Sequence, residues 1–175
     1  MEIGPDSSAY QEGGRLPALV LTLMMGVTAM ASTAVFPGCH RHDSYCDGAH
    51  CLCANQPTCD VGCDQGCDVT CAATDACVLS CGDDCQVSCH GSSTCQADLG
   101  KRGHYLCQDV SDCTASLAAG GTATCNRVSA CHISCQGSCQ VTCTQASTCD
   151  ITCAGGAAAT PCSASAGTFA CAMSC

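Results

Sequence analysis

Two kinds of short segment alternate along most of the chain, each with small apolar residues at every second position. The first kind includes CVLSC (77–81), CHISC (131–135) and CDITC (149–153), and the second includes CDVTC (67–71), CQVSC (85–89) and CQVTC (139–143). Cys and an aliphatic residue occupy positions i, i+2 and i+4, whereas Asp, Gln, His, Ser and Thr lie between them. This alternation predicts short β-strands with one buried face, joined by turns rich in Gly, Ser, Asp and Ala.

The segments recur in an 18-residue unit, C-x3-C-x3-C-x3-C-x5, that aligns the cysteines in four columns. The first column is Cys59, Cys77, Cys95, Cys113, Cys131 and Cys149, and the fourth is Cys53, Cys71, Cys89, Cys107, Cys125 and Cys143. The second is Cys63, Cys81, Leu99, Leu117, Cys135, Cys153 and Cys171, and the third is Cys67, Cys85, Gly103, Gly121, Cys139, Ala157 and Cys175. A unit too small to bury its own core must stack on its neighbours. We therefore predict an all-β fold, a short parallel β-solenoid of six to seven 18-residue coils cross-linked by disulfides, roughly 30 Å long at about 4.8 Å per layer.

The composition favours disulfide cross-links over an ordinary hydrophobic core. The chain has 25 cysteines in 175 residues, and from Cys39 onward it has only fifteen Leu, Ile, Val and Phe residues. Such a cysteine content is typical of a disulfide scaffold in an oxidising compartment.

The defects of the repeat predict which cysteines are joined. Cysteine is lost from the second and third columns together, at Leu99 with Gly103 and at Leu117 with Gly121, as expected if these columns are bridged. This predicts Cys63–Cys67, Cys81–Cys85, Cys135–Cys139 and Cys171–Cys175. The fourth column begins one coil early, which favours pairing each member with the next first-column cysteine: Cys53–Cys59, Cys71–Cys77, Cys89–Cys95, Cys107–Cys113, Cys125–Cys131 and Cys143–Cys149. Pairing of the first and fourth columns within one coil remains an alternative, although it leaves Cys53 unmatched.

The remaining cysteines complete twelve predicted bridges and leave one residue over. Ala157 replaces the third-column partner of Cys153, and Cys162 lies one residue after the fourth-column position, so these two cysteines are paired. Cys46 is paired with Cys51, which leaves Cys39 without a partner. An odd cysteine in an exported protein requires an explanation.

The first 38 residues predict a signal peptide or an N-terminal membrane anchor. Residues 16–35 are almost continuously apolar or small and follow Arg15, and Ala29-Met30-Ala31 offers a small-x-small cleavage site. Phe36-Pro37-Gly38-Cys39 resembles a bacterial lipobox, although Phe36 and Pro37 depart from the usual residues. The resemblance implies lipidation of Cys39 and a membrane partner at the outer membrane or cell surface. Residues 39–58 would form a tether and cap, and residues 59–175 the solenoid.

Three groups of polar residues are candidate binding sites. They are a possible transition-metal site at His40, His42 and His50, a possible calcium site at Asp60, Asp64, Asp68, Asp83 and Asp84, and a possible contact patch at Lys101, Arg102, His104 and Tyr105. The competing interpretation is that these are solvated polar residues of the cap, an acidic face and a looser turn.

Charge and composition restrict the possible functions. A net charge of −10 with few aromatic residues argues against nucleic-acid binding, and no catalytic constellation or cofactor motif stands out, so we expect no enzyme and no cofactor. The repeat region resembles, in style, cysteine-repeat lipoproteins of predatory or multicellular Gram-negative bacteria, which implies an envelope or secreted structural or binding protein. The alternative function is metal binding by thiolates or by His and Asp. The third is ice or surface binding, because the layout resembles the disulfide-braced β-solenoids of insect antifreeze proteins, although only Thr122-Ala-Thr124 and Thr142-Cys-Thr144 show their threonine pattern.

Overall fold

The computed structural model describes residues 39–42 and 45–175, within the unit Val35–Cys175. The predicted export segment, residues 1–38, lies outside the described residues, and so do the side chains of Cys39, His40 and His42. Among the described residues, no helix has the length and apolar character needed to cross a membrane.

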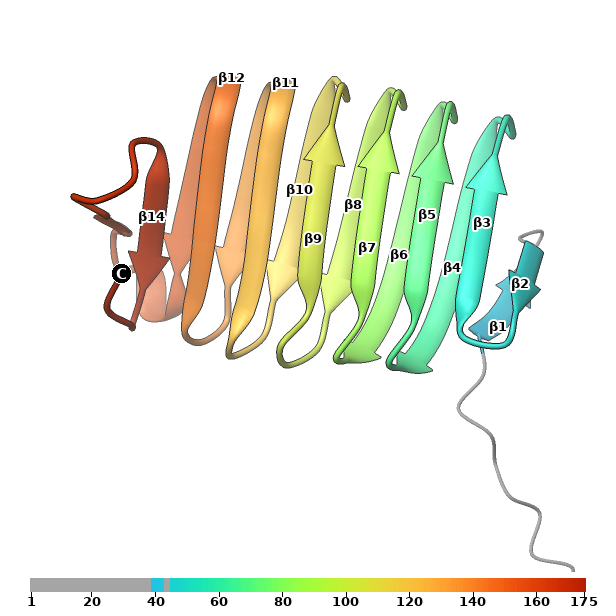
Figure 1. The fold of residues 1–175 in the computed structure, drawn as a ribbon, viewed down its shortest axis with the longest axis horizontal. Coiled ribbons are helices and arrows are strands. Elements are labelled where there is room, and N and C mark those ends of the chain that lie inside the picture. The colour runs from blue at the N-terminus through green and yellow to red at the C-terminus, as the bar shows by residue number, and fades with distance from the viewer. Residues whose placement is uncertain (1–38, 43–44) are drawn as a thin grey trace, which may run out of the picture. The chain divides into compact units, whose positions relative to one another are not determined.

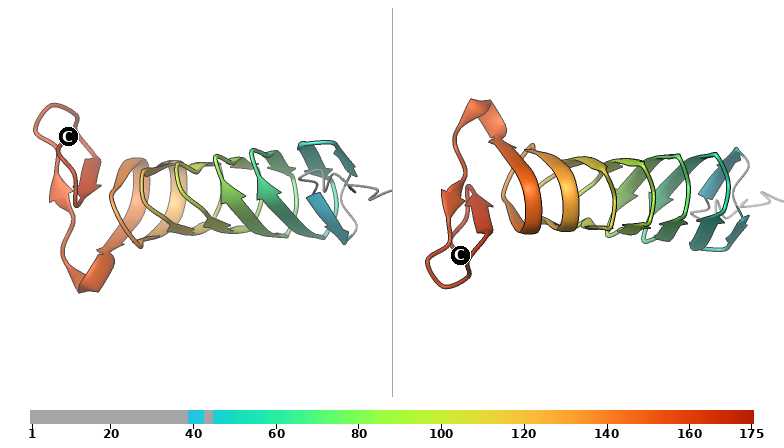
Figure 2. Two further views of the ribbon diagram at one scale, coloured as in Figure 1. Left: turned by 90° about the horizontal axis from the view of Figure 1, so that it is seen from below. Right: turned by 90° about the horizontal axis from the view of Figure 1, so that it is seen from above.

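The described chain forms a parallel β-solenoid with two sheets facing each other across the core (Figures 1 and 2). The first sheet contains β4 (Thr58–Gln65), β6 (Ala76–Asp83), β8 (Thr94–Leu99) and β10 (Asp112–Leu117). The second contains β3 (His50–Ala54), β5 (Asp68–Ala72), β7 (Gln86–His90) and β9 (His104–Gln108). Two long strands, β11 (Gly121–Cys135) and β12 (Cys139–Cys153), continue the second sheet with their first halves and the first sheet with their second halves.

The strands stack in the predicted 18-residue register. Cys59, Cys77 and Cys95 are aligned on neighbouring strands of the first sheet, and Cys71 and Cys89 are aligned in the second. The predicted fold class is therefore confirmed. The parallel stack already includes β3, so it begins before the predicted boundary at residue 59.

Alternating side chains of both sheets point inward and form the core. In the first sheet, Cys77, Leu79 and Cys81 are each no more than 5% exposed, and their outward neighbours on β6 are exposed. A strand has a side-chain period of two, so this alternation places every cysteine of a repeat on the inner face.

The cysteines form twelve disulfides, and ten of them join the pairs predicted from the repeat. These ten are Cys46–Cys51, Cys53–Cys59, Cys63–Cys67, Cys71–Cys77, Cys81–Cys85, Cys89–Cys95, Cys107–Cys113, Cys125–Cys131, Cys135–Cys139 and Cys143–Cys149. Each repeat bridge spans one of the two turns of a coil. The alternative pairing of the first and fourth columns within one coil is wrong.

The two predicted bridges at the C-terminus are wrong. The structure joins Cys153 to Cys171 and Cys162 to Cys175, in place of Cys153–Cys162 and Cys171–Cys175. The column rule fails here because the chain leaves the coil after β12, through the short 3-10 turn η1 (Ala154–Gly156). It then returns as β14 (Thr168–Cys171), antiparallel to β12. Cys171 consequently lies opposite Cys139, and the column positions of a continued coil no longer apply.

The two coils without a bridge between the second and third columns replace it with a leucine packed against a glycine. Leu99 and Leu117 are buried, and a Cβ on Gly103 would lie 2.8 Å from the Cβ of Leu99. In the same region Tyr105 is 2% exposed, and the inward positions of β8 and β10 include two small buried residues, Ala97 and Ala115. Its hydroxyl donates a hydrogen bond to the carbonyl of Cys95 at 3.0 Å. The joint loss of two cysteines thus preserves the packing of the turn.

We expect Gly103→Ala to destabilise the protein by about 1–3 kcal/mol, the usual cost of overpacking. The added methyl group would overlap the Cβ of Leu99, and neither atom is at the end of a flexible side chain. Urea denaturation of the oxidised protein measures the loss. The double variant Leu99→Gly/Gly103→Ala is the control, because glycine at position 99 lacks the Cβ that the added methyl group would meet. Its destabilisation should be less than the sum of the single effects, and strict additivity would contradict this packing.

The two ends of the solenoid are closed differently. At the N-terminal end, β1 (Cys39–His42) pairs antiparallel with β4, and β2 (Tyr45–Asp47) pairs antiparallel with β3, so both sheets are covered. At the C-terminal end, β14 pairs with Cys139–Thr142 of β12, and β13 (Thr160–Pro161) pairs with β14. The cap strands cover the edge of the second sheet, whereas the first sheet is contacted by this segment only at its end, through a bridge between Thr152 and Ala158.

Candidate functional site

The outer face of the first sheet carries a shallow groove built from short polar side chains. Its volume is about 280 Å³, and it extends over four consecutive strands. The outward residues that line it are Gln96, Asp98, Thr114, Ser116, His132, Ser134, Asp150 and Thr152. Strand alternation brings them to this face, and the 18-residue register aligns Ser116 with Ser134 and Ser134 with Thr152.

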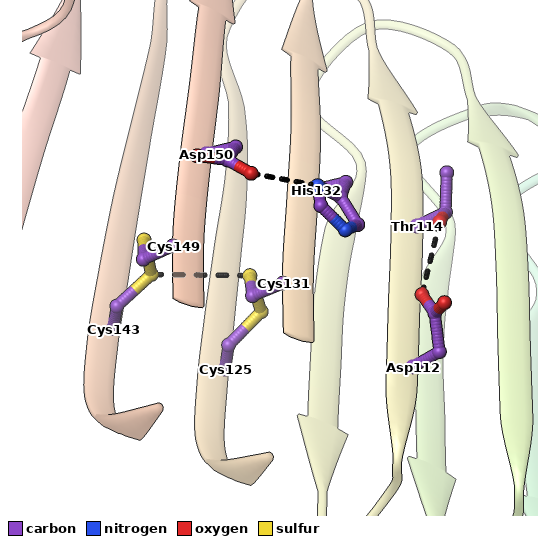
Figure 3. A network of polar contacts seen from close by, with 8 residues as sticks. All are labelled: Asp112, Thr114, Cys125, Cys131, His132, Cys143, Cys149 and Asp150. Carbon is purple, nitrogen blue, oxygen red and sulfur yellow. Dashed lines mark hydrogen bonds and ion pairs between the residues drawn. A yellow bond between two sulfur atoms is a disulfide. The ribbon is translucent and has the colours of Figure 1, made fainter. Parts of the chain in front are cut away.

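The C-terminal half of this groove contains a contact between a histidine and a carboxylate of neighbouring coils, which is an ion pair when the imidazole is protonated. The Nδ1 atom of His132 lies 3.1 Å from a carboxylate oxygen of Asp150 (Figure 3). The two side chains are 44% and 64% exposed, so solvent screens the pair and its contribution to stability is small. Beneath it, the sulfur atoms of Cys143 and Cys131 lie 3.8 Å apart, which shows how closely the bridges of neighbouring coils approach (Figure 3).

A second hollow, about 570 Å³, lies at the N-terminal end of the second sheet. Its wall includes the Cys46–Cys51 bridge, His50, Leu52 and Asp68. The Nδ1 atom of His50 is 3.6 Å from a carboxylate oxygen of Asp68, and both side chains are exposed.

The predicted histidine site is divided between the two sheets. His40 and His42 belong to β1, whose backbone pairs with β4 of the first sheet. His50 belongs to β3 of the second sheet, where its polar neighbour is Asp68. The backbone positions therefore do not support one site shared by these three residues.

The predicted calcium site is likewise dispersed. Asp60 lies on the outer side of β4 in the first sheet, whereas Asp68 lies on β5 in the second sheet. Asp83 and Asp84 instead bind the next coil: Asp83 accepts a hydrogen bond from the main-chain N–H of Lys101 at 2.7 Å, and Asp84 pairs with Arg102. In the described part of the chain, every close group of three or more potential metal ligands consists of cysteines.

The predicted basic patch does not form one surface. Tyr105 is a core residue, and burial raises the pKa of its hydroxyl above the ordinary value. The guanidinium of Arg102 donates to both carboxylate oxygens of Asp84, at 2.6 Å from Nε, and this hydrogen-bonded pair lowers the pKa of Asp84. The Nδ1 atom of His104 lies 2.6 Å from the hydroxyl of Thr122.

A second bidentate pair, Asp109 with Arg127, has a pKa consequence that can be tested. Hydrogen bonds from Arg127, with a smaller contribution from Gln108, lower the pKa of Asp109 from 3.8 to about 2. We expect Arg127→Gln to return this pKa toward 3.8, as measured by NMR titration of the Asp109 carboxyl. Arg102→Gln is the matched control and should leave it unchanged. A depressed folded-state pKa stabilises the fold above the unfolded pKa, and this contribution is lost as the pH falls from about 3.8 through about 2. An unchanged Asp109 pKa in Arg127→Gln would contradict the ion pair.

The sulfur atoms of stacked bridges form compact clusters inside the core. The sulfurs of Cys63, Cys67, Cys81 and Cys85 all lie within 4.8 Å of one another. In the structure these four residues form two disulfides, Cys63–Cys67 and Cys81–Cys85. A disulfide offers no thiolate, so these sulfurs can bind a metal ion only after reduction.

Sequence reasoning missed the contacts between residues 18 positions apart. His132 with Asp150, Asp84 with Arg102 and Asp109 with Arg127 all have this spacing. So do Thr74 and Ser92, whose buried hydroxyls lie 2.9 Å apart. The 18-residue spacing itself is the signal for these pairs, because turn residues and outward residues one repeat apart lie side by side just as the cysteines do.

The fold and its bridges define the chain as a disulfide-braced parallel β-solenoid with a polar outer surface. No family model, no curated protein and no solved structure matches the chain.

Proposed function

We propose that this protein is an exported, non-enzymatic surface module that serves as a rigid spacer or binding surface at the cell envelope. The observation that carries the proposal is the series of disulfides from Cys46 to Cys175, which runs beneath two outer sheet faces of mostly short polar side chains. Such extensive bridging is typical of proteins in oxidising compartments outside the cytosol. The bridges would make the module rigid and resistant to proteases.

The groove on the first sheet is the best candidate binding surface within this proposal. Ser116, Ser134 and Thr152 present hydroxyl groups one strand spacing apart, and Asp98 and Asp150 add carboxylates. Hydroxyls both donate and accept hydrogen bonds. The groove would therefore suit an extended, polar and uncharged or weakly cationic ligand.

We further propose that Cys39 attaches the module to the membrane through a lipid. In the described part of the chain all other cysteines are bridged, and Cys39 begins β1 at the N-terminal end of the solenoid. A lipid there would anchor the module by one end, with both sheet faces open to the surroundings. The apolar residues 16–35 would then act as the signal that is removed.

Cell fractionation of a producing bacterium tests export and anchoring together. We expect the wild-type protein in the membrane fraction, accessible on intact cells to a protease or to a membrane-impermeant label. We expect Cys39→Ala to appear in a soluble, exported fraction. If Cys39→Ala stays membrane-bound, an uncleaved apolar segment is the anchor and the lipid proposal is wrong. A wild-type protein in the cytoplasm with free thiols would contradict the whole proposal.

A second candidate function, thiolate metal binding, is favoured by the cluster of Cys63, Cys67, Cys81 and Cys85. Four thiolates at this spacing match the tetrahedral ligand sets of zinc sites. Elemental analysis and a thiol count of the native protein distinguish the two functions. Metal binding predicts bound zinc or copper with free thiols, whereas the disulfide-braced module predicts neither. The double variant Cys81→Leu/Cys85→Gly, which copies Leu99 and Gly103, would remove the site without disturbing the packing.

A further inference from the structure

We infer that the protein forms a two-fold dimer through the uncovered half of its C-terminal end, with a second copy of this chain as the partner. The surface is the edge of β12 over residues 144–151, which we call the open edge. The inference does not depend on the proposed function.

The open edge lacks the strand that lies beside every earlier coil. The cap pairs with Cys139–Thr142, and the main-chain N–H of Cys143 donates to the carbonyl of Gly167 at 2.8 Å. Beyond the open edge, Thr152 forms a single bridge with Ala158. Figure 2 shows the segment after β12 swinging out beyond the width of the stacked coils before it returns as β14. Between these contacts, no described strand pairs with the outer side of β12.

The main-chain groups of the open edge are left available for a partner strand. In earlier coils, Ala73 and Asp109 donate their N–H groups to the carbonyl of the following coil at 3.1 Å. Gln145 occupies the same turn position two coils after Asp109 and has the same left-handed backbone, with φ of 55°. Among the described residues no following coil lies beside Gln145. A row of unpaired donors and acceptors of this kind is a template for strand addition.

The inward side chains at the open edge leave the end of the core partly exposed. Cys125, Val128, Cys131 and Ile133 are each no more than 4% exposed, because the last coil covers them. Their counterparts one repeat later are all half-exposed: Cys143, Ala146, Cys149 and Ile151. A partner that adds a strand here would therefore cover apolar core residues as well as satisfy main-chain hydrogen bonds.

Charge and topology point to a second copy as the occupant. Residues 144–149 carry no charge, so Asp150 is the single ionised side chain that each copy of this acidic chain brings to the open edge. The edge also has no Pro, Lys or Arg, the residues that commonly prevent edge-to-edge association. At the N-terminal end, β1 and β2 pair antiparallel with β4 and β3, so the parallel register of the coils is interrupted there and does not offer the open edge of another copy a continuation of the stack. Two open edges paired antiparallel about a two-fold axis form a closed dimer.

The mass in solution of the oxidised, mature protein tests this inference, and it is measured on the soluble Cys39→Ala form because a lipid at Cys39 would itself cause association. The wild type of this experiment is that form with no further substitution. Light scattering after size-exclusion chromatography at about 100 μM should give twice the chain mass. Ala146→Lys and Ile151→Lys each place a charge at the uncovered core end, and both should give monomers with unchanged circular dichroism. Gln86→Lys, on the outer face of β7, is the matched control and should remain dimeric. A monomeric wild-type protein, open-ended polymers, or lysine variants that stay dimeric would overturn the inference.

Hydrogen exchange gives a second readout that does not rely on variants. The amides of Gln145, Cys149 and Ile151 should be protected in the dimer and lose protection on dilution to the monomer. Amides of β7, in the middle of the solenoid, should be protected in both states. Concentration-independent exchange at the open edge would contradict the dimer.

Discussion

Reduction of the disulfides is expected to unfold the solenoid. Nine repeat bridges close loops between cysteines four or six residues apart, and each of these loops contributes about 2 kcal/mol in the chain-entropy model. Taken as an upper bound, their sum exceeds the net stability of an ordinary domain, about 5–15 kcal/mol. The core contains few large apolar side chains, so little else can offset the chain entropy once the bridges are open.

Circular dichroism and limited proteolysis, with and without a phosphine reductant, measure this effect. The oxidised protein should keep its β-sheet spectrum at high temperature and resist protease, and the reduced protein should lose both properties. The oxidised form of the reductant is the control for chemical side effects. Reduced protein that keeps its spectrum and its resistance would show that the aliphatic core is sufficient without the bridges.

Truncation of Tyr105 is expected to give the largest loss of stability from a single substitution outside the cysteines. Tyr105 is 2% exposed and belongs to the part of the core where the inward residues Ala97 and Ala115 are small and where the bridge between the second and third columns is missing. Replacing a large buried aromatic residue by alanine costs about 3–5 kcal/mol. The neighbouring coils cannot close the cavity, because their backbones are fixed by the hydrogen-bonded ladder and by the bridges on either side.

Denaturation of Tyr105→Ala under oxidising conditions measures this loss, with Tyr105→Phe as the matched control. The phenylalanine variant keeps the ring but removes the hydrogen bond to the carbonyl of Cys95, so it should lose only about 1 kcal/mol. A similar loss for both variants would mean that the hydrogen bond, and not the ring volume, stabilises this coil. A loss below 1 kcal/mol for Tyr105→Ala would contradict its place in the core.

The repeat made most of the fold predictable because residues one repeat apart are neighbours in space. The 18-residue columns predicted the stacking register, the inward face and the bridges across both turns. The paired losses at Leu99 with Gly103 and at Leu117 with Gly121 identified which columns are bridged, and the structure explains the losses by the packing of leucine on glycine.

The predictions that failed concern the C-terminal end, where the repeat stops, and the question of which side chains of a strand point inward or outward. After Cys153 the chain turns back, and Cys171 meets β12 from an antiparallel strand, so spacing no longer predicts the partner of a cysteine. Tyr105 was grouped with its basic neighbours, although strand alternation points its side chain inward while the side chain of His104 points outward. The candidate groove was missed because its residues are far apart in the sequence and only the stacking of β8, β10, β11 and β12 brings them together.

The intact mass of the native, mature protein tests the central claim most directly. We expect a protein that begins at Cys39, carries a lipid on this residue and holds no metal. Its mass should rise on reduction by two hydrogens for each of twelve bridges. Peptide mapping without reduction should then recover Cys153–Cys171 and Cys162–Cys175 at the C-terminal end. A native protein with free thiols and bound zinc or copper would contradict the disulfide-braced solenoid and support a metal-thiolate protein.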